Sequence, residues 1–419
     1  MSKKKRRKNR ERDELSFLAD SLNLHGRPEF DGLIPDDLPP PKPMSDANKK
    51  RGPAEATTIR QKGDPDLSAV LAEAISHSGK IDRATHRFHT YPAGMHPDCA
   101  KQLIALFPGK VHDPFCGGGT VLVEGMLAGR EVSGSDLSPV AELVAKARTA
   151  PKSLATPLRS AARKLAAQAQ LRIDVEVPEG IEQWYEHHVA QEIGRIVNGI
   201  SEYDETVQPL LKAVLSSILV KSSYRESDTS NRRVPSHRPP GTTATLFHKK
   251  ARELGRALET LPDGYTANVR YGDARMLAPK DVDWIITSPP YPGVYDYLPM
   301  QQLRYLWLDL QTTDRMHREI GARRSFRAQG RGEALKEWRM DTSAWIHKQA
   351  SGLNQGGHMA IVVGDGLVGG KLVDALFPTT EAMQTAGIEI IARASADRPD
   401  HARNATRTEH LVLGRKTIE

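Results

Sequence analysis

Long apolar runs, cysteines and aromatic residues are all scarce in this chain. No apolar run reaches the roughly eighteen residues that a spanning helix needs, so we expect no contact with a membrane. The amino terminus is basic without an apolar segment behind it, which excludes a secretory signal. Only Cys99 and Cys116 are present, outside any metal-like cluster. We therefore expect no disulfide framework, no metal site and a cytoplasmic protein.

The positive charge of the chain is concentrated at its start. The net charge is +7, and residues 1–12 hold eight Lys or Arg against one Glu, so the remainder balances to zero. We predict that residues 1–65 form a disordered basic tail and a Pro-rich linker. Such a tail contacts polyanions without sequence preference or only keeps the chain soluble.

The five residues TSPPY at 287–291 follow the apolar run 282–286, which predicts a buried strand that ends abruptly. Two prolines fix φ and remove two backbone donors, so we expect a rigid loop. The loop leaves the Ser288 hydroxyl, the proline carbonyls and the flat face of Tyr291 to a ligand. That set suits a planar base with an amino group, although a plain strand-end turn is the alternative.

A second loop, DPFCGGGT at 113–120, runs from a strand end through three glycines into an apolar helix. Glycines at such a turn let the backbone approach a ligand closely, and the helix start adds unpaired N–H groups. The next strand ends at Asp136, where an acid binds ribose hydroxyls in dinucleotide folds. Asp113 precedes the glycines and is placed to face a cationic amine.

These features favour a nucleoside that carries an amino acid. No Walker lysine follows the glycines, so a cradle for ATP phosphates is not expected. S-adenosylmethionine (AdoMet) is a nucleoside of this kind. Cys116 is interpreted as a small residue beside the cofactor and not as a nucleophile. The residues expected to bind AdoMet here are Asp113, Phe115, Gly117, Gly119, Thr120 and Asp136.

Together, DPFCGGGT and TSPPY resemble the AdoMet-binding and catalytic motifs of the DNA amino-methyltransferases, which methylate N4 of cytosine or N6 of adenine. The SPPY form is typical of the cytosine-N4 branch. The resemblance covers roughly residues 87–136 and 269–419. It implies a site-specific DNA methyltransferase with AdoMet as its cofactor, and a restriction–modification system in which a cognate restriction endonuclease is the partner.

The resemblance also implies roles for single residues. Tyr91 lies in a segment that packs over the methionine end of AdoMet. Asp273, at the end of strand 267–271, meets the adenine amino group or caps a helix. Ser288 and the Pro289 carbonyl hold the target amine within the rigid loop that Pro290 completes, and Tyr291 stacks on the base. Two alternatives stay open: adenine-N6 methylation, and an RNA methyltransferase of the tRNA guanine-N2 type, which usually has Asp or Asn before Pro-Pro-Tyr.

The alternation of strands and helices predicts an α/β fold. We expect a three-layer Rossmann-like class I methyltransferase sandwich with a mostly parallel sheet and both motifs at carboxyl strand ends. Residues 66–150 would form the first part of the methyltransferase domain and 263–419 its catalytic part. Apolar residues recur at helical spacing between them, which predicts a helical insertion at 151–262.

Two internal segments are basic and lie in the expected recognition regions. Residues 221–256 carry nine Lys or Arg against three acids, and 315–339 carry eight against three. Such runs contact phosphates and base edges or are simply solvated faces. We expect the insertion, together with 311–340, to recognise the nucleic acid. The candidates for contact are Arg232, Arg233, Arg238, Arg323 and Arg324.

Overall fold

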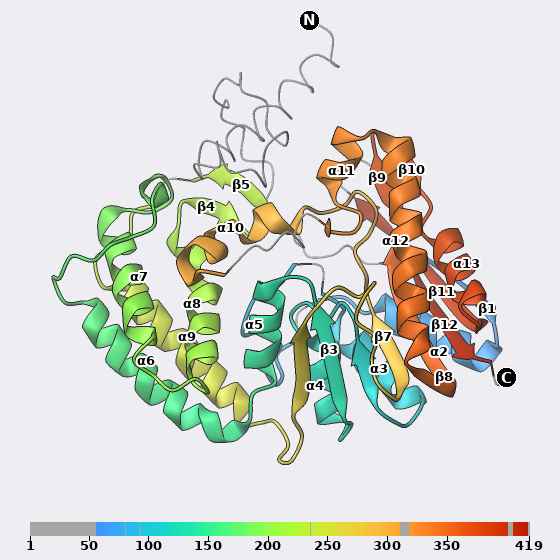
Figure 1. Cartoon of the computed structure of the whole chain (residues 1–419), viewed down its shortest axis with the longest axis horizontal. Coiled ribbons are helices and arrows are strands. Elements are labelled where there is room, and N and C mark those ends of the chain that lie inside the picture. The colour runs from blue at the N-terminus through green and yellow to red at the C-terminus, as the bar shows by residue number, and fades with distance from the viewer. Residues whose placement is uncertain are drawn as a thin grey trace, which may run out of the picture.

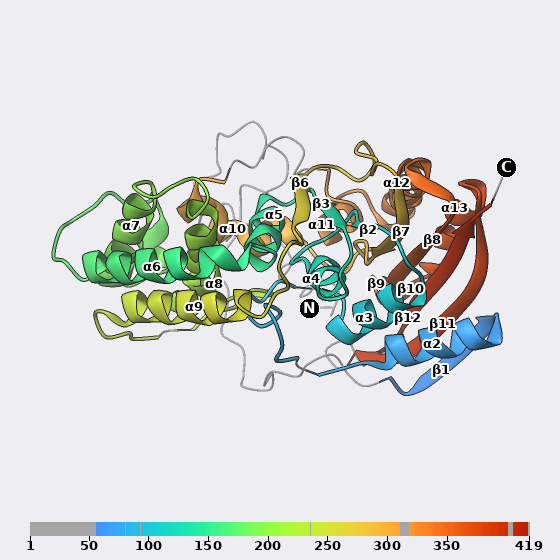
Figure 2. The same cartoon turned by 90° about the horizontal axis from the view of Figure 1, so that it is seen from below.

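One eight-stranded sheet with helices on both faces organises the chain (Figures 1 and 2). The structure is a computed structural model that describes residues 56–79, 81–92, 94–234, 236–310, 318–400 and 405–417. Of the basic tail and Pro-rich linker predicted over residues 1–65, residues 1–55 lie outside the described residues. Among the residues described, no helix has the length and apolarity to cross a membrane.

The strand order in the sheet is β1-β11-β12-β8-β7-β2-β3-β6. Pairing is parallel from β6 through β3, β2 and β7 to β8, and antiparallel from β8 outward. The strands of the parallel part are β2 (Val111–Asp113), β3 (Val132–Asp136), β6 (Ala267–Tyr271), β7 (Val282–Thr287) and β8 (Leu353–Gly364). The predicted Rossmann-like sandwich with a mostly parallel sheet is confirmed.

Helices cover both faces of the sheet, so its central strands are largely buried. In β7, Trp284, Ile285 and Ile286 have no exposed surface. Figure 2 shows the two helical layers. One layer consists of α2 (Pro65–Ser76), α3 (Pro97–Leu106) and α4 (Thr120–Leu127), and the opposite layer of α12 (Arg331–Ser351) and α13 (Leu376–Thr385). Helix α5 (Pro139–Arg148) follows β3 and contacts β3 and β6.

The antiparallel edge of the sheet corrects one predicted boundary. Strands β11 (Ile388–Asp400) and β12 (Ala405–Lys416) form the hairpin expected at the end of such a sheet. Residues 58–63, predicted to belong to the disordered linker, instead form β1 (Thr58–Gly63) and pair antiparallel with β11. The ladder is reinforced by Arg60, which binds Asp397 with an N···O distance of 2.6 Å. All six residues of this edge strand are exposed, so most of them are polar or charged. The sequence therefore lacks the apolar pattern by which a strand is predicted.

The segment 151–262 contains four long helices and a small hairpin. These elements are α6 (Ala155–Ala169), α7 (His187–Ile200), α8 (Gln208–Ser222), β4 (Arg225–Ser227), β5 (Ser230–Arg233) and α9 (Thr242–Leu258). The hairpin was not predicted, since its strands are short and polar. Figure 1 shows the segment beside the sheet, next to α5. Helix α8 contacts both α5 and α10 (Tyr297–Leu308).

Helices α12 and α13 and a small hairpin lie in the carboxyl half of the chain. Helix α12 is preceded by the short α11 (Arg323–Ala328). It ends before Gly352, where a Cβ would lie 2.1 Å from the Pro279 carbonyl oxygen. Helix α13 begins at Leu376. The strands β9 (Gly366–Val368) and β10 (Lys371–Val373) precede it as a tight hairpin with two glycines at positive φ between them.

Candidate functional site

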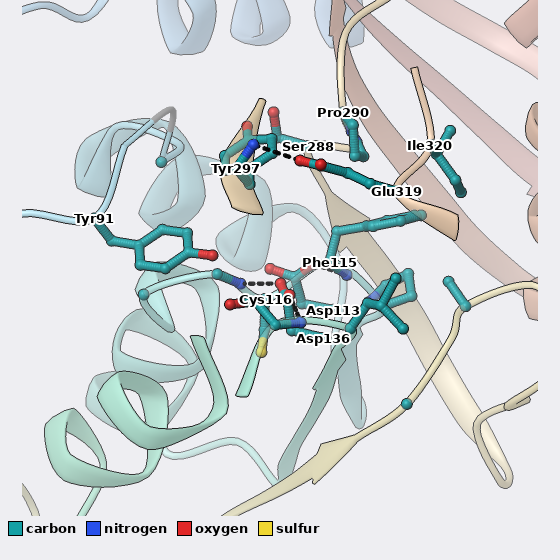
Figure 3. Close-up of a pocket in the computed structure, with 18 of the residues that line it drawn as sticks. Tyr91, Asp113, Phe115, Cys116, Asp136, Ser288, Pro290, Tyr297, Glu319 and Ile320 are labelled. Atoms are coloured by element: carbon teal, nitrogen blue, oxygen red, sulfur yellow. Dashed lines mark hydrogen bonds between the residues drawn. The ribbon is translucent and has the colours of Figure 1, made fainter. Parts of the chain in front are cut away.

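A cavity lies at the carboxyl ends of the parallel strands, where ligands bind in open α/β sheets. Its empty space is about 960 Å³ when the part open to solvent is included. Loops that follow β2, β3, β6 and β7 all contribute to its wall (Figure 3). The residues predicted from the sequence that line it are Tyr91, Asp113, Phe115, Gly117, Thr120, Asp136, Asp273, Ser288 and Pro290.

The glycine turn places a bare stretch of backbone against the cavity. Gly117 has φ +47° and Gly119 has φ +79°, a conformation that side chains rarely adopt. A Cβ on Gly117 would lie 3.2 Å from the Tyr91 ring. Gly119 does not line the cavity. It precedes α4, and an added Cβ would lie 3.1 Å from Ala145 of α5, so close packing between α4 and α5 accounts for a glycine here.

Asp113 joins the glycine turn to the TSPPY loop. The Thr287 hydroxyl donates a hydrogen bond to Asp113 Oδ1 at 2.6 Å, across 174 positions of sequence, and the Phe115 N–H donates to the same oxygen at 3.1 Å. Burial raises the pKa of Asp113 to about 7, against the two hydrogen bonds that lower it. The two motifs that the sequence singled out therefore meet, and the carboxyl between them is costly to ionise until a cation arrives.

Asp136 anchors the other side of the glycine turn. Its carboxylate accepts hydrogen bonds from the Gly117 N–H at 2.9 Å and the Ser138 N–H at 2.8 Å. Burial raises the pKa of Asp136 to about 6, while these amides lower it. Asp136 lines the cavity, and a carboxylate oxygen can accept more than one hydrogen bond, so this group suits the two hydroxyls of a ribose.

Asp273 lines the cavity, but its carboxylate is already engaged. Arg275 donates to Oδ1 from Nε at 3.0 Å and to Oδ2 from Nη2 at 2.7 Å, and the Arg275 N–H donates to Oδ1 at 2.9 Å. Arg275 also binds Asp341 of α12 at 2.7 Å. The bonds from Arg275 lower the pKa of Asp273 against the effect of burial. The predicted helix cap is absent, since a turn without a helix follows, and any contact to an adenine amine must share this carboxylate with Arg275.

Only part of the TSPPY loop at 287–291, here called the catalytic loop, lines the cavity. Ser288 and Pro290 line the cavity, whereas Pro289 and Tyr291 do not. The Tyr291 hydroxyl donates to Glu409 of β12 at 2.9 Å, and its ring packs against Gly364, where a Cβ would lie 2.5 Å from it. The Tyr291 ring is therefore held by the sheet and does not face the glycine turn.

Arg148 holds the Tyr91 segment against the glycine turn. It was not among the site residues predicted from the sequence. This arginine is 5% exposed. Its Nη1 donates to the Gly118 carbonyl at 2.8 Å, and its Nη2 donates to the carbonyls of His86 and His89 at 2.5 and 2.9 Å. Burial lowers the pKa of Arg148 to about 10. From the sequence alone it is an ordinary basic residue in the last turn of a helix.

The cavity is completed by residues that the sequence did not single out for the site. Tyr297, at the first position of α10, lines it together with three consecutive residues that precede α11, namely Arg318, Glu319 and Ile320. Figure 3 shows the Glu319 carboxylate directed at the Tyr297 backbone N–H, which donates to Oε1 at 2.5 Å. Tyr297 lies beyond the TSPPY motif and was not predicted as a site residue. Glu319 lies in the basic segment 315–339, where only arginines were selected as candidates.

Four of the five arginines predicted to contact nucleic acid are bonded within the chain. Arg233 binds the Gln183 carbonyl and its guanidinium lies 5.7 Å from the centre of the Trp184 ring. Arg238 binds the Lys221 carbonyl. Arg323 donates to the Val294 carbonyl at 2.7 Å and Arg324 pairs with Glu319 at 2.5 Å. These four arginines hold loops in place. Arg232 is exposed and pairs only loosely, at 3.5 Å, with exposed Glu226.

Buried arginines tie the β4–β5 hairpin to α10. Arg304 of α10 is 2% exposed and pairs with Asp228, in the turn of the hairpin, at 2.6 Å. Arg225, 5% exposed, donates from the hairpin to the Met300 carbonyl at 3.1 Å. Because α10 continues the chain from the catalytic loop, the hairpin is held in a fixed position relative to the cavity.

One group of potential metal ligands lies away from the cavity. His77, His96 and Asp98 each bring a ligand atom within 4.8 Å of the others. The two imidazole rings are stacked with an interplanar angle of 17°. Asp98 is paired with Arg83 at 2.7 Å. His77 follows α2 and His96 precedes α3, so the stacked rings join the ends of these two helices.

No family model matches the chain. The type II methyltransferase M.MvaI of Kocuria varians is 27% identical to it over 270 residues, which are 55% of this chain and 59% of the relative. The chain thus spans less than two thirds of that relative's length.

Solved structures similar to the chain include TrmN from Thermus thermophilus (TM-score 0.30, 12% identity, 76% of this chain and 48% of that one). They also include the rRNA methyltransferase aviRa from Streptomyces viridochromogenes (0.30, 13%, 78% and 89%) and TehB from Haemophilus influenzae (0.33, 11%, 78% and 63%). At these TM-scores we base no argument on them.

Proposed function

We propose that the chain is an AdoMet-dependent DNA methyltransferase that modifies an exocyclic amino group, the N4 of cytosine in particular. The observation that carries the proposal is the hydrogen bond between Asp113 and Thr287, which joins the glycine turn and the catalytic loop at the wall of one cavity. The likeness to a type II methyltransferase supports the same reaction class. Cytosine is favoured by Ser288 in the SPPY form of the loop.

The chemistry of the cavity fits AdoMet. Two carboxyls, the buried Asp113 and the partly buried Asp136, match a cationic amine and a ribose diol, and Gly117 gives close access to backbone. Phe115 and Tyr91 supply apolar surface, and Thr120 a hydroxyl at the start of α4. When bound, AdoMet supplies an electrophilic methyl group on its sulfonium. The arrival of its amine stabilises the ionised form of Asp113, whose pKa is raised in its absence.

The catalytic loop at 287–291 would bind the base that accepts the methyl group. An exocyclic amine of a base is a weak nucleophile, because its lone pair is delocalised into the ring. A hydrogen bond from the amine to the Ser288 hydroxyl would draw the nitrogen toward a tetrahedral shape. The Pro289 carbonyl, also expected to accept from the amine, belongs to a residue that does not line the cavity. No strong base is needed at this step, and the loop contributes mainly by holding the nitrogen in position. In a duplex, the base must first turn out of the stack, at a cost of a few kcal/mol.

Nucleic acid would approach the end of the molecule that carries α10, the β4–β5 hairpin and α11 (Figure 1). Because Arg238, Arg323 and Arg324 are partly buried and bonded internally, the contacts to phosphates would fall to exposed cations. Within the described residues, these are Arg232, Arg233, Arg318 and Arg327 on this side. A cognate restriction endonuclease would be the functional partner of such an enzyme, since it would share the target sequence.

Methyl transfer from tritiated AdoMet tests the proposal. Purified protein is incubated with plasmid DNA and, separately, with bulk tRNA, and the modified nucleosides are identified by mass spectrometry. We expect label in DNA as N4-methylcytosine. Label as N6-methyladenine would correct the target base, and label in tRNA alone would overturn the DNA proposal.

The role of Ser288 is tested with Ser288→Ala. Loss of one positioned hydrogen bond at the reacting atom lowers kcat by roughly 100-fold, whereas AdoMet binding measured by calorimetry should stay within a factor of about 2. Ser201→Ala, at an exposed position after α7, is the matched control. A Ser288→Ala variant with wild-type activity would show that the hydroxyl does not hold the amine.

A further inference from the structure

A single short segment connects the cofactor side of the cavity to its catalytic side. We call residues 318–324 the strap. At its start, the Arg318 carbonyl accepts from Arg275 Nη2 at 3.0 Å, and Arg275 is the residue that holds Asp273. Arg318, Glu319 and Ile320 then line the cavity in succession. The strap therefore begins at the loop after β6 and forms part of the cavity wall.

The other end of the strap is paired with the segment that follows TSPPY. The Gly293 N–H donates to the Gly321 carbonyl at 2.9 Å, and the Arg323 N–H donates to the Tyr295 carbonyl at 3.1 Å. The Arg324 N–H donates to Asp296 Oδ1 at 2.8 Å. These bonds follow residues 293–296 almost one by one, so the course of the chain after the catalytic loop depends on the strap.

Glu319 makes the last of these contacts, and here the strap supplies the carboxylate. Its Oε1 accepts from the Tyr297 N–H at 2.5 Å, and its Oε2 pairs with Arg324 Nη1 at 2.5 Å. The side chain is 10% exposed, and burial raises the pKa of Glu319 although Arg324 opposes this. Because the carboxylate is shielded from solvent and both of its oxygens have partners, its position is well defined.

The bond falls at a backbone group that has no partner within its own helix. Tyr297 is the first residue of α10, and the N–H groups at the start of a helix must find partners outside it. Asp296, the residue before it, makes no capping bond from its side chain. Glu319 supplies that partner, and the negative charge is favourable at this end of the helix. The start of α10, and with it the Tyr297 wall of the cavity, is fixed by the strap.

We propose that Glu319 is a positioning residue for methyl transfer: by accepting the Tyr297 N–H, it sets the wall of the cavity beside Ser288. The inference rests on the proposed function. Glu319 acts through Tyr297 and takes no part in bond making. In its absence the helix start and the Tyr297 ring are free to shift, and the acceptor base is held less well.

Two substitutions of equal size separate this role from a stabilising one. Glu319→Gln keeps an oxygen for the Tyr297 N–H, whereas Glu319→Met removes it, and both lose the ion pair with Arg324. We expect kcat of Glu319→Gln to stay within about threefold of wild type. Glu319→Met should lose about tenfold or more, since small displacements of a reacting group are costly. The AdoMet dissociation constant, measured by calorimetry, should change less than about threefold in both.

The matched controls are Glu333→Gln and Glu333→Met at an exposed position of α12. They should leave kcat, the AdoMet dissociation constant and the urea midpoint of unfolding unchanged. Equal kcat values for the two Glu319 variants, or losses that follow their urea midpoints alone, would overturn the inference. Should Glu319→Met not fold, Tyr297→Ala serves instead. It should lower kcat to a similar level, and adding Glu319→Gln to it should cause no further loss.

The two proposals fail in different ways. If wild-type protein transfers no methyl group to plasmid DNA or tRNA, the proposed function is refuted and the role of Glu319 with it. If wild type transfers and the Met variant transfers equally well, only the role of Glu319 is refuted.

Discussion

Replacing Asp113 by Asn should stabilise the protein without AdoMet, increasingly so as the pH rises. Burial raises the pKa of Asp113 from 3.8 to about 7. Between these values the folded state binds more protons than the unfolded state, so this carboxyl lowers the free energy of unfolding as the pH increases. At 1.36 kcal/mol per pKa unit, the cost is about 1.5 kcal/mol at pH 5 and about 4 kcal/mol at pH 8.

The amide of the variant avoids ionisation and keeps the acceptor for Thr287 and Phe115. Its buried NH₂ group gains no partner, which costs about 1–3 kcal/mol at every pH. The difference between variant and wild type should therefore be near zero at pH 5 and favour the variant by about 2 kcal/mol at pH 8. The stability difference between variant and wild type should therefore increase by about 2.5 kcal/mol from pH 5 to pH 8. The cost of the unpaired NH₂ group does not affect this increase, because it is the same at both pH values.

Urea unfolding at pH 5, 6, 7 and 8 without AdoMet measures this difference. Asp174→Asn, at an exposed position in the loop before α7, is the control and should follow wild type throughout. The same Asp113→Asn protein should bind AdoMet at least tenfold more weakly by calorimetry, since the cationic amine loses its buried counter-charge. A stability difference that is constant with pH, or that is largest at pH 5, would refute the reasoning.

Two further expectations concern packing and the insertion. Gly364→Ala places a methyl group 2.5 Å from the Tyr291 ring and should cost about 1–3 kcal/mol and lower methyl transfer, whereas Gly332→Ala, with open space in α12, should stabilise by about 0.5–1 kcal/mol. A Gly364→Ala protein as stable and active as wild type would contradict the described packing. Arg304→Met leaves Asp228 without its partner and should cost about 3 kcal/mol in urea unfolding, part of which Asp228→Asn should restore. If Asp228→Asn restores nothing, the ion pair does not hold the hairpin.

The parallel part of the fold could be predicted because its signals are local. A buried strand that ends in Asp113 or Asp136, followed by a helix, carries its own pattern of apolar residues and turn residues. The rule that ligands bind at carboxyl strand ends then brought both motifs to one edge of the sheet. Their contact through Thr287 is where that rule is realised in atoms.

The sequence could not show which charged side chains bind each other in the folded protein. Arg275 lies two residues from Asp273, and Glu319 five residues from Arg324, but neither spacing indicates whether the side chains pair or are left for a ligand. Arg148 and Glu319 act through backbone groups far from them in sequence. A count of basic residues therefore overestimates the charge available for nucleic acid.

The hydrophobic core has a practical consequence for re-engineering. Leu143 of α5, Leu215 of α8 and Leu254 of α9 belong to one buried cluster with Trp284 of the central strand. A specificity module that can be transplanted between enzymes would have a polar surface where it meets the rest of the protein. In the described residues, the helices of 151–262 instead share one hydrophobic core with the sheet. Grafting a foreign insertion would uncover α5 and α10 together, so altered target preference is better sought by changing residues on the existing hairpin.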